Sequence, residues 1–356
     1  MEHDFALCVH AYYAGEPEVG RRACERLLSS PLPEETEHQV RSNRTWYTSK
    51  LDDLAPVRQV RIDVPPAEPG WSTFNPTLLR HDGQLLAIVR SSNYQIVNGQ
   101  YQMPAADGGQ IRTRNQLVRL TGELGVVDCR TITDADYPRS GYVVTGLEDC
   151  RLRHTQTGLG VSATVRDVAP FTDGRCRIAA ADLDVDTATL ANLRVLDSLA
   201  TPGDEKNWMP IEGRGGWLYG SHINGHVVTV DDDRRMPGAW HLCRRSPSPA
   251  LARGFRGGSQ LVPFRDGWLC LIHEVAIVDA GHRAYEHRFV WFDNWLRLAR
   301  VSPPFTFQVH RGIEFAAGLV AEGDRVIASY GVRDAEAWLA ELRADDVWQL
   351  LSSPAT

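Results

Sequence analysis

Two adjacent carboxylates and an arginine occur together in the segment 146–152. Glu148 and Asp149 are followed by Arg151, with apolar residues on either side. If the segment is a strand, Asp149 and Arg151 share one face and Glu148 points to the other, because alternate side chains point the same way. Arg151 favours the ionised form of Asp149 and burial favours the protonated form, which suits proton transfer to a leaving group. A structural ion pair would use the same residues.

Further polar residues interrupt the apolar runs along the chain. They include amides, guanidinium groups, a phenol and a carboxylate, which suit the hydroxyl groups of a sugar, and aromatic rings suit its apolar faces. Asp334 could instead cap a following helix. We expect substrate contacts from Asn75, Arg90, Tyr94, Asn115, Arg151 and Asp334.

A second set of residues suits an anion. Lys206 and Lys50 are the only lysines, so a lysine in the middle of the chain is conspicuous. A histidine in such a set could bind phosphate or sugar, or could be a buried residue with satisfied hydrogen bonds. The expected anion ligands are Lys206, Asn207, His222 and His273.

Two glutamates are candidates for a general base. Glu274 and Glu314 could each activate water in an inverting hydrolysis, which needs two carboxyl groups about 6.5–9.5 Å apart. Glu314 could alternatively form an ion pair with one of the many arginines. With Asp149 as the acid, these residues complete the expected catalytic set.

The elements that must position these residues are short strands. From Val57 onward, apolar runs such as 85–89, 160–165 and 268–272 alternate with Gly, Asp-Gly and Pro turn signals. Strand clusters recur about every 50 to 60 residues, which predicts an all-β, five-bladed β-propeller over residues 53–333 with blades of about four strands. A pair of stacked sheets is the alternative. In a propeller, the inner strands converge on the axis and bring one polar group per blade into a central pocket.

Helices are expected at both ends. Residues 1–52 predict a helical appendage, with a tetratricopeptide-type hairpin turning at Gly15 and a further helix over about 34–51. It could bind a partner or cover a hydrophobic surface. Residues 334–356 predict a C-terminal helix packed on the propeller, because apolar residues follow a helical stripe from Ala335.

The composition excludes several classes of protein. Of 356 residues, 23% are charged and 43% hydrophobic, with a net charge of −7, so no nucleic acid partner is expected. Seven scattered cysteines without a CxxC pair argue against a disulfide scaffold and a zinc site. No apolar run approaches ~18 residues, so no membrane span is expected and a cytoplasmic location is favoured. No cofactor or metal is expected, since the Gly257–Ser259 segment is too common a pattern to indicate a phosphate loop.

Taken in order, the polar segments resemble motifs of glycoside hydrolase family 130, the β-mannoside phosphorylases and β-mannosidases. Residues 148–151 resemble the Glu-Asp-Pro-Arg motif that holds the family's catalytic Asp, here Asp149. Segments 206–210, 261–274 and 329–334 resemble its later motifs in order and spacing. The resemblance implies a five-bladed propeller, chemistry on a β-mannoside-like bond and a single inverting displacement.

Two departures bear on the reaction. In the family's phosphorylases an Arg that contacts phosphate follows a His directly, but Ile223 follows His222 here. The family's Tyr-His-Gly is replaced by a sequence in which Glu274 follows His273, and a carboxylate there would repel phosphate. An inverting hydrolase, a glycosyltransferase that uses a sugar phosphate or nucleotide sugar, and a non-catalytic sugar-binding propeller remain open. The N-terminal hairpin resembles repeats joined to bacterial glycosyltransferases, which favours sugar transfer or a glycosyltransferase partner.

Overall fold

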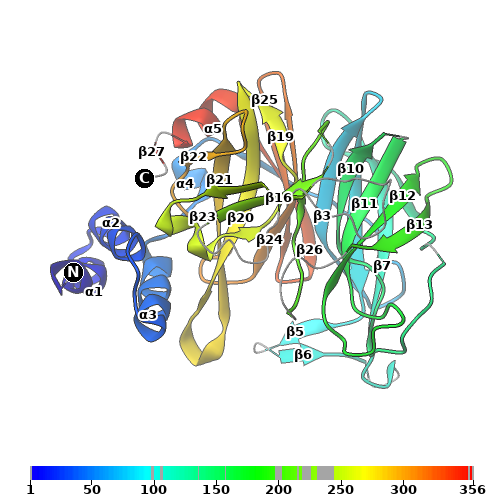
Figure 1. The fold of residues 1–356 in the computed structure, drawn as a ribbon, viewed down its shortest axis with the longest axis horizontal. Helices are drawn as coiled ribbons and strands as arrows, with labels where there is room; N and C mark the ends of the chain where they lie inside the picture. Colours follow the sequence, from blue (N-terminus) through cyan, green and yellow to red (C-terminus); the bar gives the residue numbers. More distant parts are fainter. Residues whose placement is uncertain are drawn as a thin grey trace.

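The computed structural model describes residues 2–97, 100–104, 107–134, 136–156, 158–196, 203–214, 216–218, 226–230, 244–351 and 353–354. Strands dominate these ranges, and Figure 1 shows the helices confined to one side of the sheets. The described residues form five sheets of four or more strands and one two-stranded sheet. That number matches the five strand clusters expected from the sequence; their arrangement as five blades stays a prediction.

The first two large sheets are built mainly from consecutive antiparallel strands. The first contains β3 (Ser72–His81), β4 (Gln84–Ser92), β7 (Ile111–Leu120), β8 (Val126–Thr131) and the short β9 (Val144–Thr145). The second contains β10 (Glu148–Thr155), β11 (Gly158–Val165), β12 (Arg177–Asp184) and β13 (Thr189–Val195). The small sheet pairs β5 (Gln95–Val97) with β6 (Gln100–Gln102).

The third and fourth large sheets follow in sequence order. The third contains β14 (Met209–Pro210), β15 (Trp217–Leu218), β16 (His226–Val230) and β17 (Arg244–Pro247). The fourth contains β18 (Arg256–Gly257), β19 (Val262–Phe264), β20 (Gly267–Ile277), β21 (Arg283–Phe292), β22 (Leu298–Val301) and β23 (Phe305–Thr306), joined by β1 (Ser49–Lys50) and β27 (Ser353–Pro354).

The fifth sheet joins distant parts of the chain. It contains β24 (Glu314–Glu322), β25 (Arg325–Val332), β26 (Glu336–Arg343) and β2 (Arg58–Arg61). β2 pairs antiparallel with β26, so a strand from the start of the sheet region completes the last sheet.

Hydrophobic cores lie between neighbouring sheets in a cyclic order. Separate cores join the first sheet to the second, the second to the third, the third to the fourth and the fourth to the fifth. A further core joins the fifth sheet back to the first, where Leu85, Ala87 and Val89 meet Val320 and Ile327. The residues between them in β4 point to the opposite core. Because β4 is buried on both faces, its residues are apolar in succession, which explains the continuous apolar run in the sequence.

The expected C-terminal helix is wrong over most of its length. Residues Glu336–Arg343 are strand β26, and only Ala344–Leu350 form a helix, α5. Ala337 and Leu339 point into the core shared with the first sheet, while Ala340 and Leu342 point into the core shared with the fourth sheet. Successive side chains of the segment thus alternate between two buried faces, as in a strand. Its apolar residues lie so close together in the sequence that they resemble the stripe of a helix.

Three helices form the N-terminal appendage: α1 (Glu2–Ala14), α2 (Pro17–Leu28) and α3 (Glu34–Arg44). A 3₁₀ turn (Thr45–Tyr47) and the short α4 (Leu51–Leu54) follow, so the long helix expected over 34–51 ends early. The appendage has its own small core, with Cys8, Cys24 and Val40 among its buried residues. Gly20 allows the Tyr47 ring to pack there, because an added Cβ would lie 2.4 Å from it.

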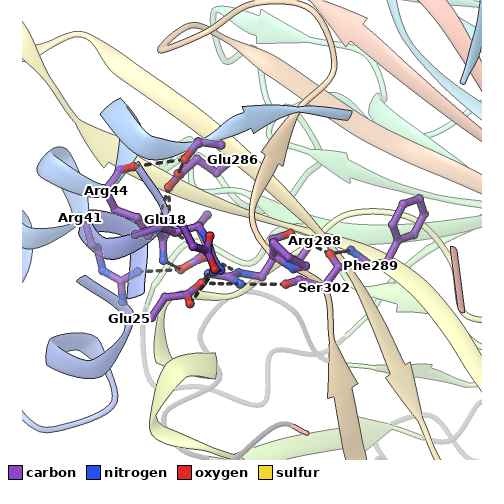
Figure 2. A network of polar contacts seen from close by, with 12 residues as sticks. Glu18, Glu25, Arg41, Arg44, Glu286, Arg288, Phe289 and Ser302 are labelled. Carbon is purple, nitrogen blue, oxygen red and sulfur yellow. Dashed lines mark hydrogen bonds and ion pairs between the residues drawn. The ribbon is translucent and has the colours of Figure 1, made fainter. Parts of the chain in front are cut away.

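Buried ion pairs dock this appendage onto the fourth sheet (Figure 2). Arg44 lies 2.5 Å from Glu286 and 3.0 Å from Glu274. Glu274 also pairs with Arg41 at 2.8 Å and with Arg288 at 2.9 Å. Arg44 and Glu274 are each about 1% exposed or less in their side chains. The appendage therefore covers a charged surface here, in contrast to the hydrophobic one considered from the sequence.

Candidate active site

One cavity of about 520 Å³ collects polar side chains from the appendage and from several sheets. Its acidic residues are Glu148, Asp149, Asp204 and Asp334. Its basic residues are Arg41, Arg90, Lys206, Arg256 and Arg283, with His38 and His273. Its amides and rings include Asn75, Asn207, Tyr94, Tyr101, Tyr285 and Phe315. Carboxylates, amides, arginines and aromatic rings in one cavity suit a polyhydroxylated ligand.

Asp149 is held by two neighbours on the first sheet. Its Oδ1 accepts hydrogen bonds from Asn75 Nδ2 and Arg90 Nη1, each at 3.0 Å. Burial by itself raises the pKa of Asp149, but Arg90 and the Asn75 amide outweigh burial and hold the pKa below its usual value. Asp149 is therefore ionised in the empty cavity at neutral pH.

Glu148 and Asp149 do not follow the alternation of an ordinary strand. The pairing of β10 with β11 shifts register between Glu148 and Arg151, and Asp149 has a φ of 49°. This bulge brings both carboxylates to the cavity, where Arg90 lies 3.0 Å from Asp149 and 3.6 Å from Glu148. The expectation that Glu148 points to the opposite face is wrong, because a bulge breaks the period of two.

Left-handed backbone recurs at the cavity. Asn75, Asn207 and Asp334 also have positive φ values, of 47°, 59° and 50°. Asn and Asp tolerate this conformation better than other residues with side chains, although it costs energy. Asn75 lies in another register shift, between β3 and β4. Asn75 reaches the cavity at an irregularity of strand β3, and Asn207 and Asp334 reach it from left-handed positions just outside strands β14 and β25.

Asp334 lies in the same cavity and interacts with Tyr94. The Tyr94 hydroxyl donates to Asp334 Oδ2 at 2.8 Å. Burial raises the pKa of Asp334, and the opposing charge of Arg90 does not cancel this rise. Asp334 thus keeps a proton to higher pH than an ordinary aspartate does. It does not cap α5, which begins ten residues later.

Arg151 is a positioning residue behind the cavity wall. It is 2% exposed, and its Nε donates to the Gly258 carbonyl at 2.7 Å. Its Nη1 donates to the Asp149 carbonyl at 3.0 Å, and its Nη2 donates to Asn207 Oδ1 at 3.3 Å. Burial lowers the pKa of Arg151 to about 10. Arg151 therefore joins the backbone of the Asp149 bulge to the amide of Asn207.

Three of the four expected anion ligands line the cavity. Lys206 and Asn207 contribute to one wall and His273 to another. The His273 ring stacks on Tyr285 at 5.5 Å and 15°. Burial lowers the pKa of His273 well below its usual value, so the ring is neutral at pH 7. His222 and the residue after it lie outside the described residues.

The two expected general bases do not line the cavity. Glu274 points away from it into the buried ion pairs, and its pKa is far below normal because the charges of Arg44 and Arg288 outweigh burial. Glu314 accepts backbone N–H groups of Phe307, Gln308 and Val309 at 2.6–2.7 Å. A base must reach the water that it activates, so both assignments are wrong on geometric grounds.

Asn115 also lies outside the cavity. It is fully buried and donates to the Leu147 carbonyl at 2.9 Å, so it supports the segment before Glu148 without facing a ligand.

The appendage contributes to the cavity, which was not expected from the sequence. His38 and Arg41 of α3 line it, and α3 lies beside the β20–β21 hairpin (Figure 1). Arg256 and Arg283 also line the cavity without having been expected there. The available signal was weak, since none of these four residues interrupts an apolar run as Asn75 or Arg90 does.

The described ranges contain neither a metal-binding cluster nor a membrane-spanning helix. No group of three or more His, Cys, Asp or Glu side chains there is placed to bind a metal ion. No helix within these ranges is long and apolar enough to cross a membrane.

Comparison with known proteins gives matches by fold. No family model and no curated protein matches the sequence. The β-1,2-mannobiose phosphorylase of Listeria innocua matches with a TM-score of 0.58 and 15% identity, over 83% of this chain and 99% of the phosphorylase. A mannose phosphorylase of Leishmania mexicana, solved with phosphate ion, matches with a TM-score of 0.54 and 13% identity, over 91% and 98%.

A third structure extends the comparison to glycosidases. It comes from the GH130 family of mannoside phosphorylases, which contains glycoside hydrolases that target β-1,2-mannosidic linkages in Candida mannan. It matches with a TM-score of 0.52 and 15% identity, over 83% of this chain and 96% of the other. The chain therefore has the propeller-like fold of the GH130 mannoside phosphorylases, which confirms, at the level of the fold, the resemblance carried by its motifs.

Proposed function

We propose that this protein is a carbohydrate-active enzyme that makes or breaks a β-mannoside-like bond by a single inverting displacement in a five-bladed propeller. The cyclic order of the five cores supports the blade count. The observation that carries the function is Asp149, a carboxylate at a strand bulge that is aimed into the cavity by Arg90 and Asn75. Mannoside-active neighbours with the same fold support the substrate class.

Asp149 acts as the acid, directly or through a sugar hydroxyl. Because Arg90 and Asn75 hold its pKa below the usual value, Asp149 must gain a proton when substrate binds. A sugar that displaces water from the cavity strengthens the burial effect, which raises the pKa of Asp149. Asp334 lies in the same cavity, and burial raises its pKa above the usual value.

The orientation of Glu274 bears on the choice of reaction. The sequence placed its carboxylate beside His273, where it would repel phosphate. In the structure its charge is neutralised by Arg41, Arg44 and Arg288, and it faces away from the cavity. This objection to phosphorolysis is removed, and Lys206 and His273 remain as ligands for phosphate or for the phosphate of an activated sugar.

Turnover assays test the proposal. The protein is incubated with β-mannobiose with and without phosphate, with mannose 1-phosphate plus mannose, and with nucleotide-activated mannose, and products are separated by chromatography. Asp149→Asn should lower turnover by about 10²–10⁴-fold while leaving folding intact, as expected for a general acid. Asp128→Asn, in an ion pair with Arg130 outside the cavity, is the matched control. Full activity of Asp149→Asn would exclude this assignment.

One observation favours a non-catalytic sugar-binding protein as the second candidate, serving a glycosyltransferase. The ion pair between Asp149 and Arg90 is complete without a ligand and could simply bind sugar hydroxyls. Saccharide binding by calorimetry, with no product from any donor, would support this candidate over the enzyme.

A further inference from the structure

The charges in the cavity are unevenly distributed. Glu148, Asp149 and Asp334 gather around Arg90, and each of the first two lies within 4 Å of it. Arg256 of β18 and Arg283 of β21 also line the cavity, but neither forms an ion pair or a side-chain hydrogen bond with any described residue. Both are exposed to the cavity. One part of the cavity is thus acidic with a neutralising arginine, and another is basic, with no ion-pair partner for Arg256 or Arg283 in the part of the chain that the structure describes.

The two parts have different neighbours. The charges that act most on the pKa of Asp149 are those of Arg90 and Arg151. The pKa of Arg256 is lowered by burial and, among charged groups, by Arg283 and Arg41. Arg283 and Arg41 therefore add positive charge to the surroundings of Arg256.

Helix α3 fixes the edge of this basic region. Arg41 donates from Nε and Nη2 to Glu37 at 3.0 and 2.8 Å, and from Nη1 to Glu274 at 2.8 Å. Each terminal nitrogen keeps one further N–H. Gly254 provides the space for this guanidinium, since an added Cβ would lie 2.2 Å from Nη1. Arg41 is thus held in place before any ligand arrives.

We propose that Arg256 and Arg283, with Arg41 at their edge, form an anion subsite that binds a phosphate group attached to the saccharide substrate. A guanidinium group can donate two parallel hydrogen bonds to the oxygens of one phosphate, and clustered arginines are the usual means of binding a dianion. The inference rests on the proposed function, in that the rest of the cavity takes the sugar. Tyr285 lines the same cavity and stacks on the His273 ring.

Calorimetry of the full chain with mannose 6-phosphate, mannose and inorganic phosphate tests the subsite. Wild-type protein should bind mannose 6-phosphate about tenfold or more tightly than mannose, because charge-assisted hydrogen bonds are gained. The double variant Arg256→Gln/Arg283→Gln should lose this preference. A control double variant, Arg175→Gln/Arg297→Gln, removes the same charge outside the cavity and should keep it.

The outcomes separate this subsite from the rest of the proposal. An unchanged preference in Arg256→Gln/Arg283→Gln, or its loss in Lys206→Gln alone, overturns the subsite. Binding of inorganic phosphate as tightly as mannose 6-phosphate shows that free phosphate is the ligand and also overturns it. Wild-type turnover of neutral β-mannobiose without a preference for the phosphorylated sugar refutes only the subsite. A clear preference with no turnover of any donor refutes only the catalytic proposal.

Discussion

Replacing Glu274 by Gln tests whether this residue holds the appendage or takes part in chemistry. The carboxylate is about 1% exposed and contacts three guanidinium groups, those of Arg41, Arg44 and Arg288. In the variant, Arg44 still pairs with Glu286. The new amide, however, removes the negative charge that the three guanidinium groups share and places an N–H donor against their own N–H donors. Loss of one partner from a buried ionic cluster costs about 3–5 kcal/mol. This is a large part of a typical free energy of unfolding of about 5–15 kcal/mol.

Urea unfolding followed by tryptophan fluorescence measures this loss. The matched control is Glu341→Gln, which removes a carboxylate from a more exposed cluster with Arg325 and Arg58. It should cost about 0–1 kcal/mol, as surface ion pairs do. The reasoning fails if Glu274→Gln unfolds with the same free energy as the wild type. If that stable variant were also inactive, Glu274 would be a catalytic base after all.

Two further predictions concern pH and packing. His287 is buried, neither ring nitrogen has a partner among the described residues, and burial lowers its pKa to about 3 from a usual 6.5. Between pH 3 and pH 6.5 the unfolded chain binds a proton at His287 that the folded chain does not. The contribution to the free energy of unfolding is therefore complete above about pH 6.5 and falls by about 1.4 kcal/mol per pH unit toward pH 3. His287→Leu should flatten this dependence in urea titrations at several pH values. Gly257→Ala would place a Cβ 1.8 Å from the Asn207 carbonyl oxygen and should lower both the melting temperature and saccharide affinity. Gly122→Ala, with open space around it, should leave both unchanged, and equal effects of the two would contradict the packing argument.

The sequence predicted the strands well where their periodicity was simple. Runs such as 85–89 and 325–329 are strands, and the turns before them fall at Asp82-Gly83 and Gly323-Asp324. The mistake at β26 arose where both faces are buried, because apolar residues on both faces of a strand can imitate a helical stripe. Such ambiguity is resolved only by the neighbouring sheets.

The candidate site was predicted in its residue types but less well in its geometry. Asp149, Asn75 and Asp334 do meet in one cavity. The bulge that turns Glu148 toward that cavity leaves no mark in a single sequence, since it depends on pairing with β11. Two of the three arginine partners of Glu274, Arg41 and Arg44, lie more than 200 residues away in the chain, so its burial among arginines could not be predicted from the local sequence.

Pairing of β2 with β26 has a consequence for biosynthesis. Arg58 pairs with Glu341, and the two residues are 283 positions apart. The fifth sheet therefore cannot be complete until β26 has been synthesised, and the apolar faces that the first and fifth sheets share stay uncovered until then. Contacts of such long sequence separation fold slowly and expose surfaces that aggregate. Because the cavity takes residues from both His38 and Asp334, its full set of lining residues comes together only after the chain has been made as far as Asp334.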